Sequence, residues 1–197
     1  MTKTSDHVSG ISFRPPSVDD GAEVWELIRK SGPLDENSIY CNLLQCDHFA
    51  DTCVIAELDG QIVGWISALI PPDAPDTLFV WQVAVGEAAR GRGVARKMLT
   101  HLLERDACAG IKRLQTTITA DNEASWALFN SFAEKMDADL EFEPHYDRES
   151  HFGGRQATEY MVTIEGIGGE SDRETAADTA EASRNPAPAA KTAPHEH

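Results

Sequence analysis

The sequence has few cysteines, and they are not spaced for metal binding. The four cysteines are Cys41, Cys46, Cys53 and Cys108. They form no CxxC pair, and no histidine is placed to complete a zinc-binding pattern. We therefore expect no metal and reduced thiols that serve as small apolar side chains. A disulfide within residues 41–53 is the alternative, although the cytosol does not favour one.

Long apolar runs are also absent. No stretch approaches the ~18 consecutive apolar residues of a membrane helix, and residues 1–10 lack the apolar segment of a secretory signal. We therefore expect a cytoplasmic protein that does not bind a membrane. Its 197 residues, of which 41 % are hydrophobic, suffice for one domain with an appendage.

Basic residues are scarce in comparison with acidic ones. The chain has 17 Lys and Arg against 33 Asp and Glu, which gives a formal net charge of -16. Such a surface repels phosphate backbones, so nucleic acid is not an expected partner. It attracts cations, including small amines. Adaptation of the surface to a salty cytoplasm explains the same charge.

The last segment of the chain is poor in every residue type that builds a core. After Ile167 it contains no aromatic residue and no Leu, Val, Ile or Met. Such a segment buries too little apolar surface to offset the entropy lost on ordering. We predict a disordered tail over residues 166–197, a flexible N-terminus over 1–10 and one folded domain over 11–165. A role for the tail in interactions is the alternative.

Strands and helices alternate along the folded domain, and apolar periodicity places them. Asp59-Gly60 supplies the turn of a hairpin. The order is β-α-α-β-β-β-α-β-α-β-β, which predicts an α/β fold with a mixed sheet and helices on both faces. We predict strands at 11–14, 52–58, 61–70, 77–85, 111–120, 140–144 and 158–165, and helices at 18–30, at 37–49, from 94, and after a cap at Asp121 or Asn122.

The most informative segment is 83–99, VAVGEAARGRGVARKML. It joins a buried strand to an amphipathic helix through a turn in which glycines permit positive φ and close approach to a ligand. The start of a helix offers unpaired N–H groups and positive potential, which suit a pyrophosphate. Arg90 and Arg92 add positive charge. The chain has no Walker motif, and no GxGxxG follows the first strand of a βαβ unit.

This segment resembles the acetyl-CoA motif of the GNAT acetyltransferases, [Q/R]-x-x-G-x-[G/A]. Arg90, Gly93 and Ala95 stand at the defining positions. Residues 122–129, NEASWALF, resemble the family motif N-x-x-[A/S]-x-x-L-Y, which follows after one helix and one strand. The resemblance extends over residues 11–165. It implies a mixed, mostly antiparallel sheet flanked by helices on both faces, with a splayed fourth and fifth strand.

The resemblance implies acetyl-CoA as co-substrate. Amides from Arg90 to Ala95 would hold the pyrophosphate, and the fourth strand would pair with the pantetheine arm. An N–H near Val83 would stabilise the oxyanion of the thioester carbonyl. For Asn122 a simple helix cap is the alternative. The implied cofactor-binding residues are Val83, Val85, Arg90, Gly91, Arg92, Gly93, Val94, Ala95, Asn122 and Ser125.

Proton transfer has no obvious agent in the sequence. An alkyl ammonium, with a pKa near 10.4, must lose a proton before it attacks. Many relatives carry a Tyr where this chain has Phe129, and that Tyr protonates the leaving thiolate. Tyr40 is a candidate donor, and His151 or His145 in a polar loop are candidate relays. Ordinary packing of Tyr40 and simple exposure of the histidines are the alternatives.

Three further segments resemble the diaminobutyrate acetyltransferases of ectoine biosynthesis: 31–40, 75–85 and 151–161. That resemblance implies acetylation of the 4-amino group of L-2,4-diaminobutyrate, a small diamine amino acid. Homodimers are common in the superfamily, and we expect one here.

By the same resemblance, the carboxylates of Asp35 and Glu159 would anchor the ammonium groups of the substrate. Trp81 would wall the pocket and add a cation–π contact. For Asp35 the alternative is a helix cap, for Glu159 a solvent-facing strand position, and for Trp81 a place in the core.

Two other functions stay open at this point. A GNAT enzyme for a polyamine or an aminoglycoside would benefit equally from an acidic surface. An acyl-CoA-binding sensor without turnover is the other, and Phe129 in place of Tyr is the feature that favours it.

Overall fold

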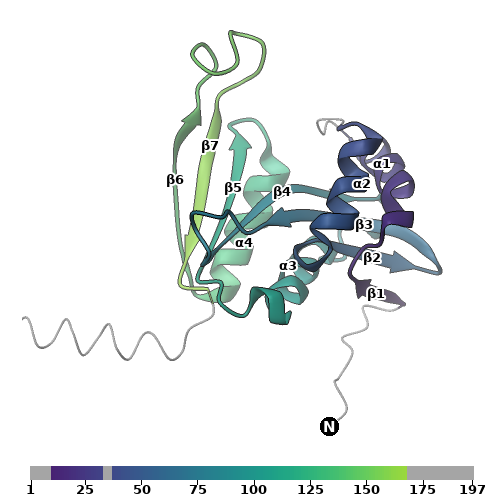
Figure 1. The fold of residues 1–197 in the computed structure, drawn as a ribbon. Helices are drawn as coiled ribbons and strands as arrows, with labels where there is room; N and C mark the ends of the chain where they lie inside the picture. The colour runs from purple at the N-terminus through teal and green to yellow at the C-terminus, as the bar shows by residue number, and fades with distance from the viewer. Residues whose placement is uncertain (1–9, 33–36, 168–197) are drawn as a thin grey trace, which may run out of the picture.

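A single seven-stranded sheet organises the computed structural model, which describes residues 10–32 and 37–167 (Figure 1). The strand order is β1-β2-β3-β4-β5-β7-β6. β4 and β5 run parallel, and the other neighbouring pairs are antiparallel. The mixed, mostly antiparallel sheet is therefore confirmed. The strands are β1 (Ile11–Arg14), β2 (Val54–Leu58), β3 (Gln61–Leu69), β4 (Thr77–Val85), β5 (Arg113–Thr119), β6 (Asp139–Tyr146) and β7 (Glu159–Glu165).

The helices cover both faces of the sheet, as expected. Those on one face pack with Trp65 and Ala84 of the sheet, whereas those on the other share a larger cluster with Leu78, Leu114 and Ile164 (Figure 1). The first pair is α1 (Gly21–Lys30) and α2 (Ile39–His48), and the second pair is α3 (Val94–Leu103) and α4 (Glu123–Met136). None of the described helices is long and apolar enough to cross a membrane.

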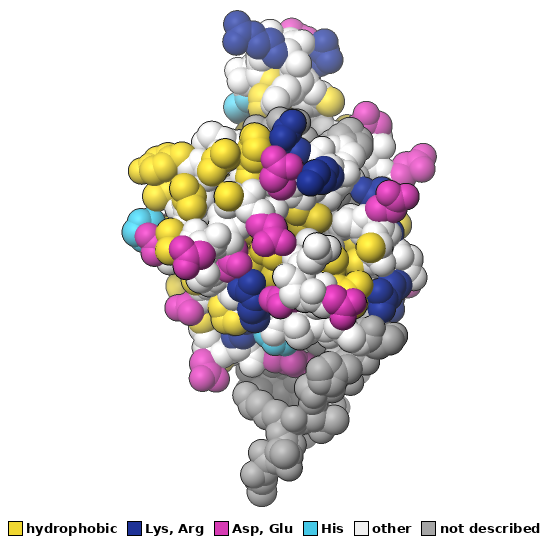
Figure 2. Space-filling view, turned by 90° about the vertical axis from the view of Figure 1, so that its right-hand side faces the viewer, with side chains coloured by type: hydrophobic (Ala, Val, Ile, Leu, Met, Phe, Trp, Pro, Cys, Tyr) yellow, Lys and Arg dark blue, Asp and Glu magenta, His cyan; other side chains and the backbone are white. Residues whose placement is uncertain are grey.

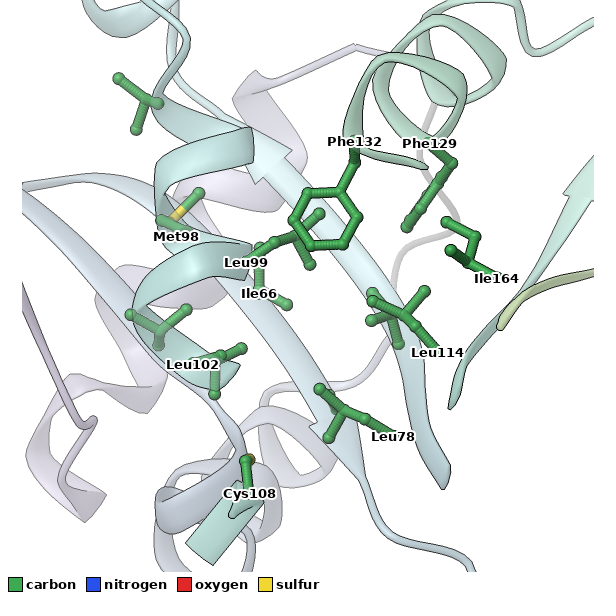
Figure 3. Close-up of a cluster of buried hydrophobic side chains, with 14 of the residues drawn as sticks. Ile66, Leu78, Met98, Leu99, Leu102, Cys108, Leu114, Phe129, Phe132 and Ile164 are labelled. Carbon is green, nitrogen blue, oxygen red and sulfur yellow. The ribbon is translucent and has the colours of Figure 1, made fainter. Parts of the chain in front are cut away.

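The larger cluster is the main core of the molecule. Figure 3 shows side chains of α3 and α4 pointing at those of the sheet. Each fully buried Leu, Ile or Phe contributes about 1.5–3 kcal/mol relative to exposure. The helices are thereby fixed over the sheet. The labelled members are Ile66, Leu78, Met98, Leu99, Leu102, Cys108, Leu114, Phe129, Phe132 and Ile164.

The predicted element boundaries lie within three residues of those in the structure; the strands expected over 52–58 and 111–120, for example, are Val54–Leu58 and Arg113–Thr119. The helix expected over 18–30 begins as a 3₁₀ turn, η1 (Val18–Asp20), because Arg14 binds the Asp20 carboxylate through two hydrogen bonds of 2.8 Å. The helix expected over 37–49 begins at Ile39, because the Ser38 hydroxyl caps it by accepting the Cys41 N–H at 3.1 Å. The strand expected over 140–144 extends to Asp139 and Tyr146.

The two ends of the folded domain lie close to the predicted limits. Ile167 is 3 % exposed, and its N–H donates to the Lys112 carbonyl at 3.1 Å, so the described fold continues two residues past the expected end. The flexible N-terminus and the disordered tail were predicted for segments that, apart from residues 10, 166 and 167, lie outside the described residues.

A bulge in β4 shapes the site. The register changes from Ser67 opposite Gln82 to Ala68 opposite Val80, which leaves Trp81 as the extra residue. β4 pairs with β5 only through residues 77–79. Beyond that point the two strands separate. The splayed fourth and fifth strands that the resemblance implied are therefore confirmed.

The face that α1 and α2 present to solvent is mixed in character. Acidic side chains are spread over it, and hydrophobic side chains gather in one group (Figure 2). Ile39, Tyr40 and Phe49 of this helix layer are 40 %, 68 % and 38 % exposed. Ile39 and Tyr40 lie in the first turn of α2, and Phe49 follows its last residue, so they stand at opposite ends of the helix.

Candidate functional site

A cleft of about 660 Å³ opens where β4 and β5 separate. Its size is typical of a small-molecule site. Its walls come from the end of α1, the end of β4, the start of α3, the end of β5 and the start of α4. The lining residues are Ser31, Gly32, Val83, Val85, Arg90, Ala95, Thr119, Asp121, Asn122, Glu123, Ala124, Ser125 and Leu128.

The glycine-rich turn forms one end of this cleft. Gly91 and Gly93 have φ values of 71° and 69°, in the left-handed region, and Gly93 is the N-cap of α3. A Cβ at Gly91 would meet no atom within 4 Å, so backbone conformation and not space requires glycine there. The first turn of α3 carries no acidic residue. Its free N–H groups and positive end therefore suit an anion.

The side chain of Arg90 turns toward the protein main chain. Its Nε donates to the Val85 carbonyl at 3.1 Å, and its Nη2 donates to the Ser31 carbonyl. The Arg90 backbone N–H already donates to the Glu87 carbonyl at 3.2 Å. This amide was expected to hold pyrophosphate, and the structure instead gives it a protein partner. The amides left for that role belong to residues 91–95.

The hydrogen-bond pattern of β4 fixes where its amides point. The Gly86 N–H donates to the Val63 carbonyl at 2.8 Å. Hydrogen-bonded and non-hydrogen-bonded pairs alternate along an antiparallel ladder. Since Gly64 lies opposite Val85 and Ile66 opposite Val83, both are non-hydrogen-bonded pairs. The N–H groups of Val83 and Val85 therefore point away from β3 and into the cleft.

The far wall of the cleft is the start of α4. Asn122 caps this helix, since its Oδ1 accepts the Ser125 N–H at 3.1 Å. The cap that was the alternative for Asn122 is thus present, and both residues also line the cleft. The Nδ2 of Asn122 is the group left for a ligand. The Trp126 indole N–H donates to the Thr119 carbonyl at 3.1 Å, which ties the end of β5 to this helix.

Trp81, at the bulge, is 47 % exposed. The alternative that it lies in the core is therefore excluded. It stands two residues before Val83 on the strand that borders the cleft, but it is not among the lining residues.

Glu159 opens β7 directly opposite Thr119, a residue that lines the cleft. Directly opposed residues of antiparallel strands point to the same face. The carboxylate of Glu159 therefore lies one strand away from the cleft, on the same face of the sheet as the Thr119 side chain.

Tyr40 and His151 lie in different surroundings. Tyr40 is 68 % exposed on the first turn of α2. His151 belongs to the connection between β6 and β7, which projects beyond the sheet (Figure 1). Its Nδ1 accepts the Asp147 N–H at 2.8 Å, so Nε2 is the nitrogen left to move a proton. Asp35 lies outside the described residues.

Asp147 holds this connection in shape. Its carboxylate accepts N–H bonds from Glu149 and Ser150 at 3.0 and 2.9 Å, and the Ser150 hydroxyl at 2.8 Å. These bonds to Ser150 and then Glu149 lower the pKa of the Asp147 carboxyl. His145 packs on Tyr146 with ring centroids 4.4 Å apart.

Phe129 and the cysteines are not placed for catalysis. Phe129 is 2 % exposed in the main core. All four cysteines are free thiols, and burial raises the pKa of each, to about 12 for Cys46 and Cys53. Thiolate is the nucleophilic form of cysteine, so transfer through an acetyl-cysteine is disfavoured. Among residues 10–32 and 37–167 no three His, Cys, Asp or Glu side chains are grouped to hold a metal.

Several residues that line the cleft were not predicted from the sequence. Thr119 and Leu128 belong to the segments around the Asn motif, so closer attention to that motif would have found them. Ser31 and Gly32 follow α1 and match no pattern of their own. They reach the cleft only because α1 packs beside the end of β4, where Leu27 Cδ1 lies 3.2 Å from the place of a Cβ at Gly86.

Comparison with known families shows which family this chain belongs to. The family model described as Acetyltransferase (GNAT) family matches residues 22–133. The chain belongs to the GNAT acetyltransferases. All of the residues that line the cleft of this GNAT acetyltransferase, from Ser31 to Leu128, lie within the matched span.

Similar proteins share one name. An L-2,4-diaminobutyric acid acetyltransferase of Methylotuvimicrobium alcaliphilum is 47 % identical over 154 residues, which are 78 % of this chain and 90 % of the relative. One from Vibrio cholerae is 45 % identical over 152 residues, 77 % of this chain and 88 % of the relative.

Solved structures agree in fold. The diaminobutyrate acetyltransferase EctA from Paenibacillus lautus, in complex with L-2,4-diaminobutyric acid and coenzyme A, superposes with a TM-score of 0.76 at 43 % identity, covering 79 % of this chain and 95 % of EctA. Ard1 from Thermoplasma volcanium, at 16 % identity and a TM-score of 0.61, covers 79 % of this chain and 97 % of its own, and shares the fold.

Proposed function

We propose that this GNAT acetyltransferase transfers the acetyl group of acetyl-CoA to the 4-amino group of L-2,4-diaminobutyrate. The product is N4-acetyl-L-2,4-diaminobutyrate, a step in the biosynthesis of the compatible solute ectoine. The observation that carries the proposal is the similarity to L-2,4-diaminobutyric acid acetyltransferases over 90 % of the length of one of them. The cleft between β4 and β5 supports it independently.

The residues around the cleft fit coenzyme A. The amides of Gly91, Arg92, Gly93, Val94 and Ala95 would bind the pyrophosphate at the positive end of α3. The outward N–H groups of Val83 and Val85 would bond the pantetheine arm as an added strand. Asn122 and Ser125 would contact the arm from α4.

Acetyl-CoA supplies the acetyl group as an activated thioester. The Val83 N–H would donate to the carbonyl oxygen as negative charge develops on it. The neutral amine nitrogen forms a bond with the carbonyl carbon, and the carbon–sulfur bond breaks to release the CoA thiolate. The amine loses one proton and the thiolate gains one. Tyr40 or His151 would carry that exchange, or water would.

The acceptor amine would be held next to the acetyl group in the cleft. The Glu159 and Asp35 carboxylates would form charge-assisted hydrogen bonds with its ammonium groups. The exposed ring of Trp81 at the bulge would wall the pocket, with a cation–π contribution of ~1 kcal/mol. The acidic surface of the chain raises the local concentration of such cations.

An amine panel tests the proposal. Purified protein with acetyl-CoA should release CoA thiol far faster with diaminobutyrate than with ornithine or lysine, and NMR should place the acetyl group on N4. Equal or faster turnover of the longer diamines, or of a polyamine, would contradict the substrate. Tight acetyl-CoA binding without thiol release for any amine would show a sensor instead of an enzyme.

We also infer a cytoplasmic homodimer. The exposed apolar side chains of Ile39 and Tyr40 at the start of α2 and of Phe49 just after its end support a contact between copies. Light scattering of the purified chain should give twice the monomer mass of 21.5 kDa. A monomer mass at micromolar concentration would contradict the dimer.

A further inference from the structure

Arg90 stands at a defining position of the cofactor motif, yet its guanidinium is bonded to two main-chain carbonyls. Nε binds Val85 at the end of β4, and Nη2 binds Ser31 at the end of α1. The two carbonyls belong to segments 54 residues apart in the sequence, and all three residues line the cleft. Arg90 therefore links the glycine-rich turn, β4 and α1.

Ser31 offers Arg90 a well-prepared acceptor. Its N–H donates to the Ile28 carbonyl at 3.1 Å, and its hydroxyl donates to the Leu27 carbonyl at 2.7 Å. The Ser31 carbonyl points out from the C-terminal end of α1, where the partial charge of the helix is negative. A cation that hydrogen-bonds there stabilises the helix end.

The first helix in turn fixes the second. The Trp25 indole N–H donates to the Asn37 carbonyl at 3.0 Å, immediately before α2 begins. Gly21 lets the helices approach so closely that a Cβ there would lie 2.6 Å from Leu43 Cδ2. A displacement of α1 would therefore carry α2, and Tyr40 on its first turn, with it.

We propose that Arg90 is a positioning residue that holds α1 and α2 in a fixed position against β4. It would thereby align the amine-binding residues with the acetyl group. The proposal rests on the function proposed above. In this role the guanidinium acts through its fork of donors, because two carbonyls on different segments must be bonded at once. A lysine keeps the charge but lacks that fork.

The fork has a second effect on the cleft. The carbonyls of Ser31 and Val85 would otherwise turn their negative ends toward a space that must accept a pyrophosphate. Arg90 covers both. Removal of its charge should therefore weaken acetyl-CoA binding, whereas replacement by Lys should mainly loosen α1. The two losses can be separated by the choice of substitution.

The test is the pair Arg90→Lys and Arg113→Lys in the full chain. Arg113 also links strands, through Thr77 and Glu165, but it lies at the opposite end of β5 from the cleft. For Arg90→Lys we expect the KM for diaminobutyrate to rise about tenfold, the loss of one charge-assisted hydrogen bond, with the KM for acetyl-CoA within about twofold. Arg113→Lys should leave both KM values unchanged.

Hydrogen exchange supplies a measurement that does not depend on turnover. In Arg90→Lys the amides of Ser31 and Cys41, which bond within α1 and at the cap of α2, should exchange about tenfold faster, while those of β5 keep the wild-type rate. Amides that exchange as in wild type, or an acetyl-CoA KM that rises as much as the amine KM, would overturn the positioning role. Wild-type protein inactive on diaminobutyrate would instead refute the proposed function and leave the exchange result to be judged alone.

Discussion

The sites proposed for the two substrates are built in different ways. The proposed cofactor side would come mainly from one continuous segment, residues 83–95, and would act through backbone amides in a turn with two left-handed glycines. The proposed amine side would be assembled from β4, α2 and β7, through Trp81, Tyr40 and Glu159. Recognition through the backbone depends on local conformation. Recognition through side chains depends on how distant elements pack.

This contrast predicts that a single substitution can change the KM for one substrate and leave the KM for the other unchanged. A change in backbone conformation at the turn should raise the KM for acetyl-CoA. A change of a side chain on the amine side should raise the KM for the amine. A core position and a helix anchor should affect stability with little effect on either KM. The four changes below are ordered by the size of the expected effect.

Gly93→Val should have the largest effect, which is weaker binding of acetyl-CoA. Gly93 has φ of 69°, and a β-branched residue there costs about 2–3 kcal/mol in strain. We expect the variant turn to relax to another conformation, which binding must reverse, so that energy corresponds to roughly a 30- to 150-fold rise in the KM for acetyl-CoA. Gly110→Val is the control, because a Cβ there meets no atom within 4 Å. Equal KM values in the two variants would show that the turn does not bind the cofactor.

Phe129→Tyr should destabilise the fold without faster catalysis. The ring is 2 % exposed, so a hydroxyl added there loses water without a prepared partner, at a cost of about 2 kcal/mol. Phe142→Tyr, at a position 60 % exposed, should change stability by less than ~0.5 kcal/mol. Urea unfolding and kcat measure both. A stable Phe129→Tyr with raised kcat would place this residue at the leaving sulfur.

Glu159→Gln should raise the KM for the amine by about tenfold, the loss of one charge-assisted hydrogen bond, with the KM for acetyl-CoA unchanged. Glu143→Gln on neighbouring β6 is the control, because it removes the same charge from an exposed strand position. Steady-state kinetics with each substrate varied in turn give the answer. Wild-type amine KM in Glu159→Gln would remove Glu159 from the pocket.

Asp20→Asn should cost about 1 kcal/mol at neutral pH. Hydrogen bonds from Arg14 lower the pKa of Asp20 from 3.8 to about 2. A lowered carboxyl pKa adds stability above the unfolded value, and that stability is lost as pH falls from about 4 to about 2. The figure is reduced because Arg14 is 37 % exposed and screened by solvent.

Chemical denaturation across pH measures this last effect. The unfolding free energies of wild type and Asp20→Asn should differ at pH 7 and converge near pH 2. Asp19→Asn removes a charge from the adjacent exposed position and should follow wild type throughout. A constant difference down to pH 2 would exclude the ion pair as its source.

The sequence was sufficient for the parts that depend on local patterns. Alternation, the Asp59-Gly60 turn and the glycine-rich segment predicted the hairpin, the central strand and the start of α3, because each is decided within a few residues. Asp59 and Gly60 both adopt the positive φ that such a hairpin turn requires.

The parts that depend on packing could not be read in the same way. Nothing near Ser31 indicates that its carbonyl meets Arg90, since the contact exists only once α1 lies beside the end of β4. Trp81 belongs to a strongly apolar strand, yet a bulge turns it to solvent. The Arg90 amide fits the motif, but the 3₁₀ turn before it, η3 (Glu87–Ala89), takes that N–H.

The short β4–β5 ladder has a consequence for the molecule as a whole. Because only residues 77–79 of β4 pair with β5, the sheet consists of two half-sheets joined by a narrow strip of hydrogen bonds and by the core beneath. A cofactor bound between the two half-sheets would contact both and stabilise their arrangement. At a concentration of 100 times its Kd it would add about 2.7 kcal/mol to the free energy of unfolding. In a cell, the supply of acetyl-CoA would then govern how long this enzyme survives as well as how fast it works.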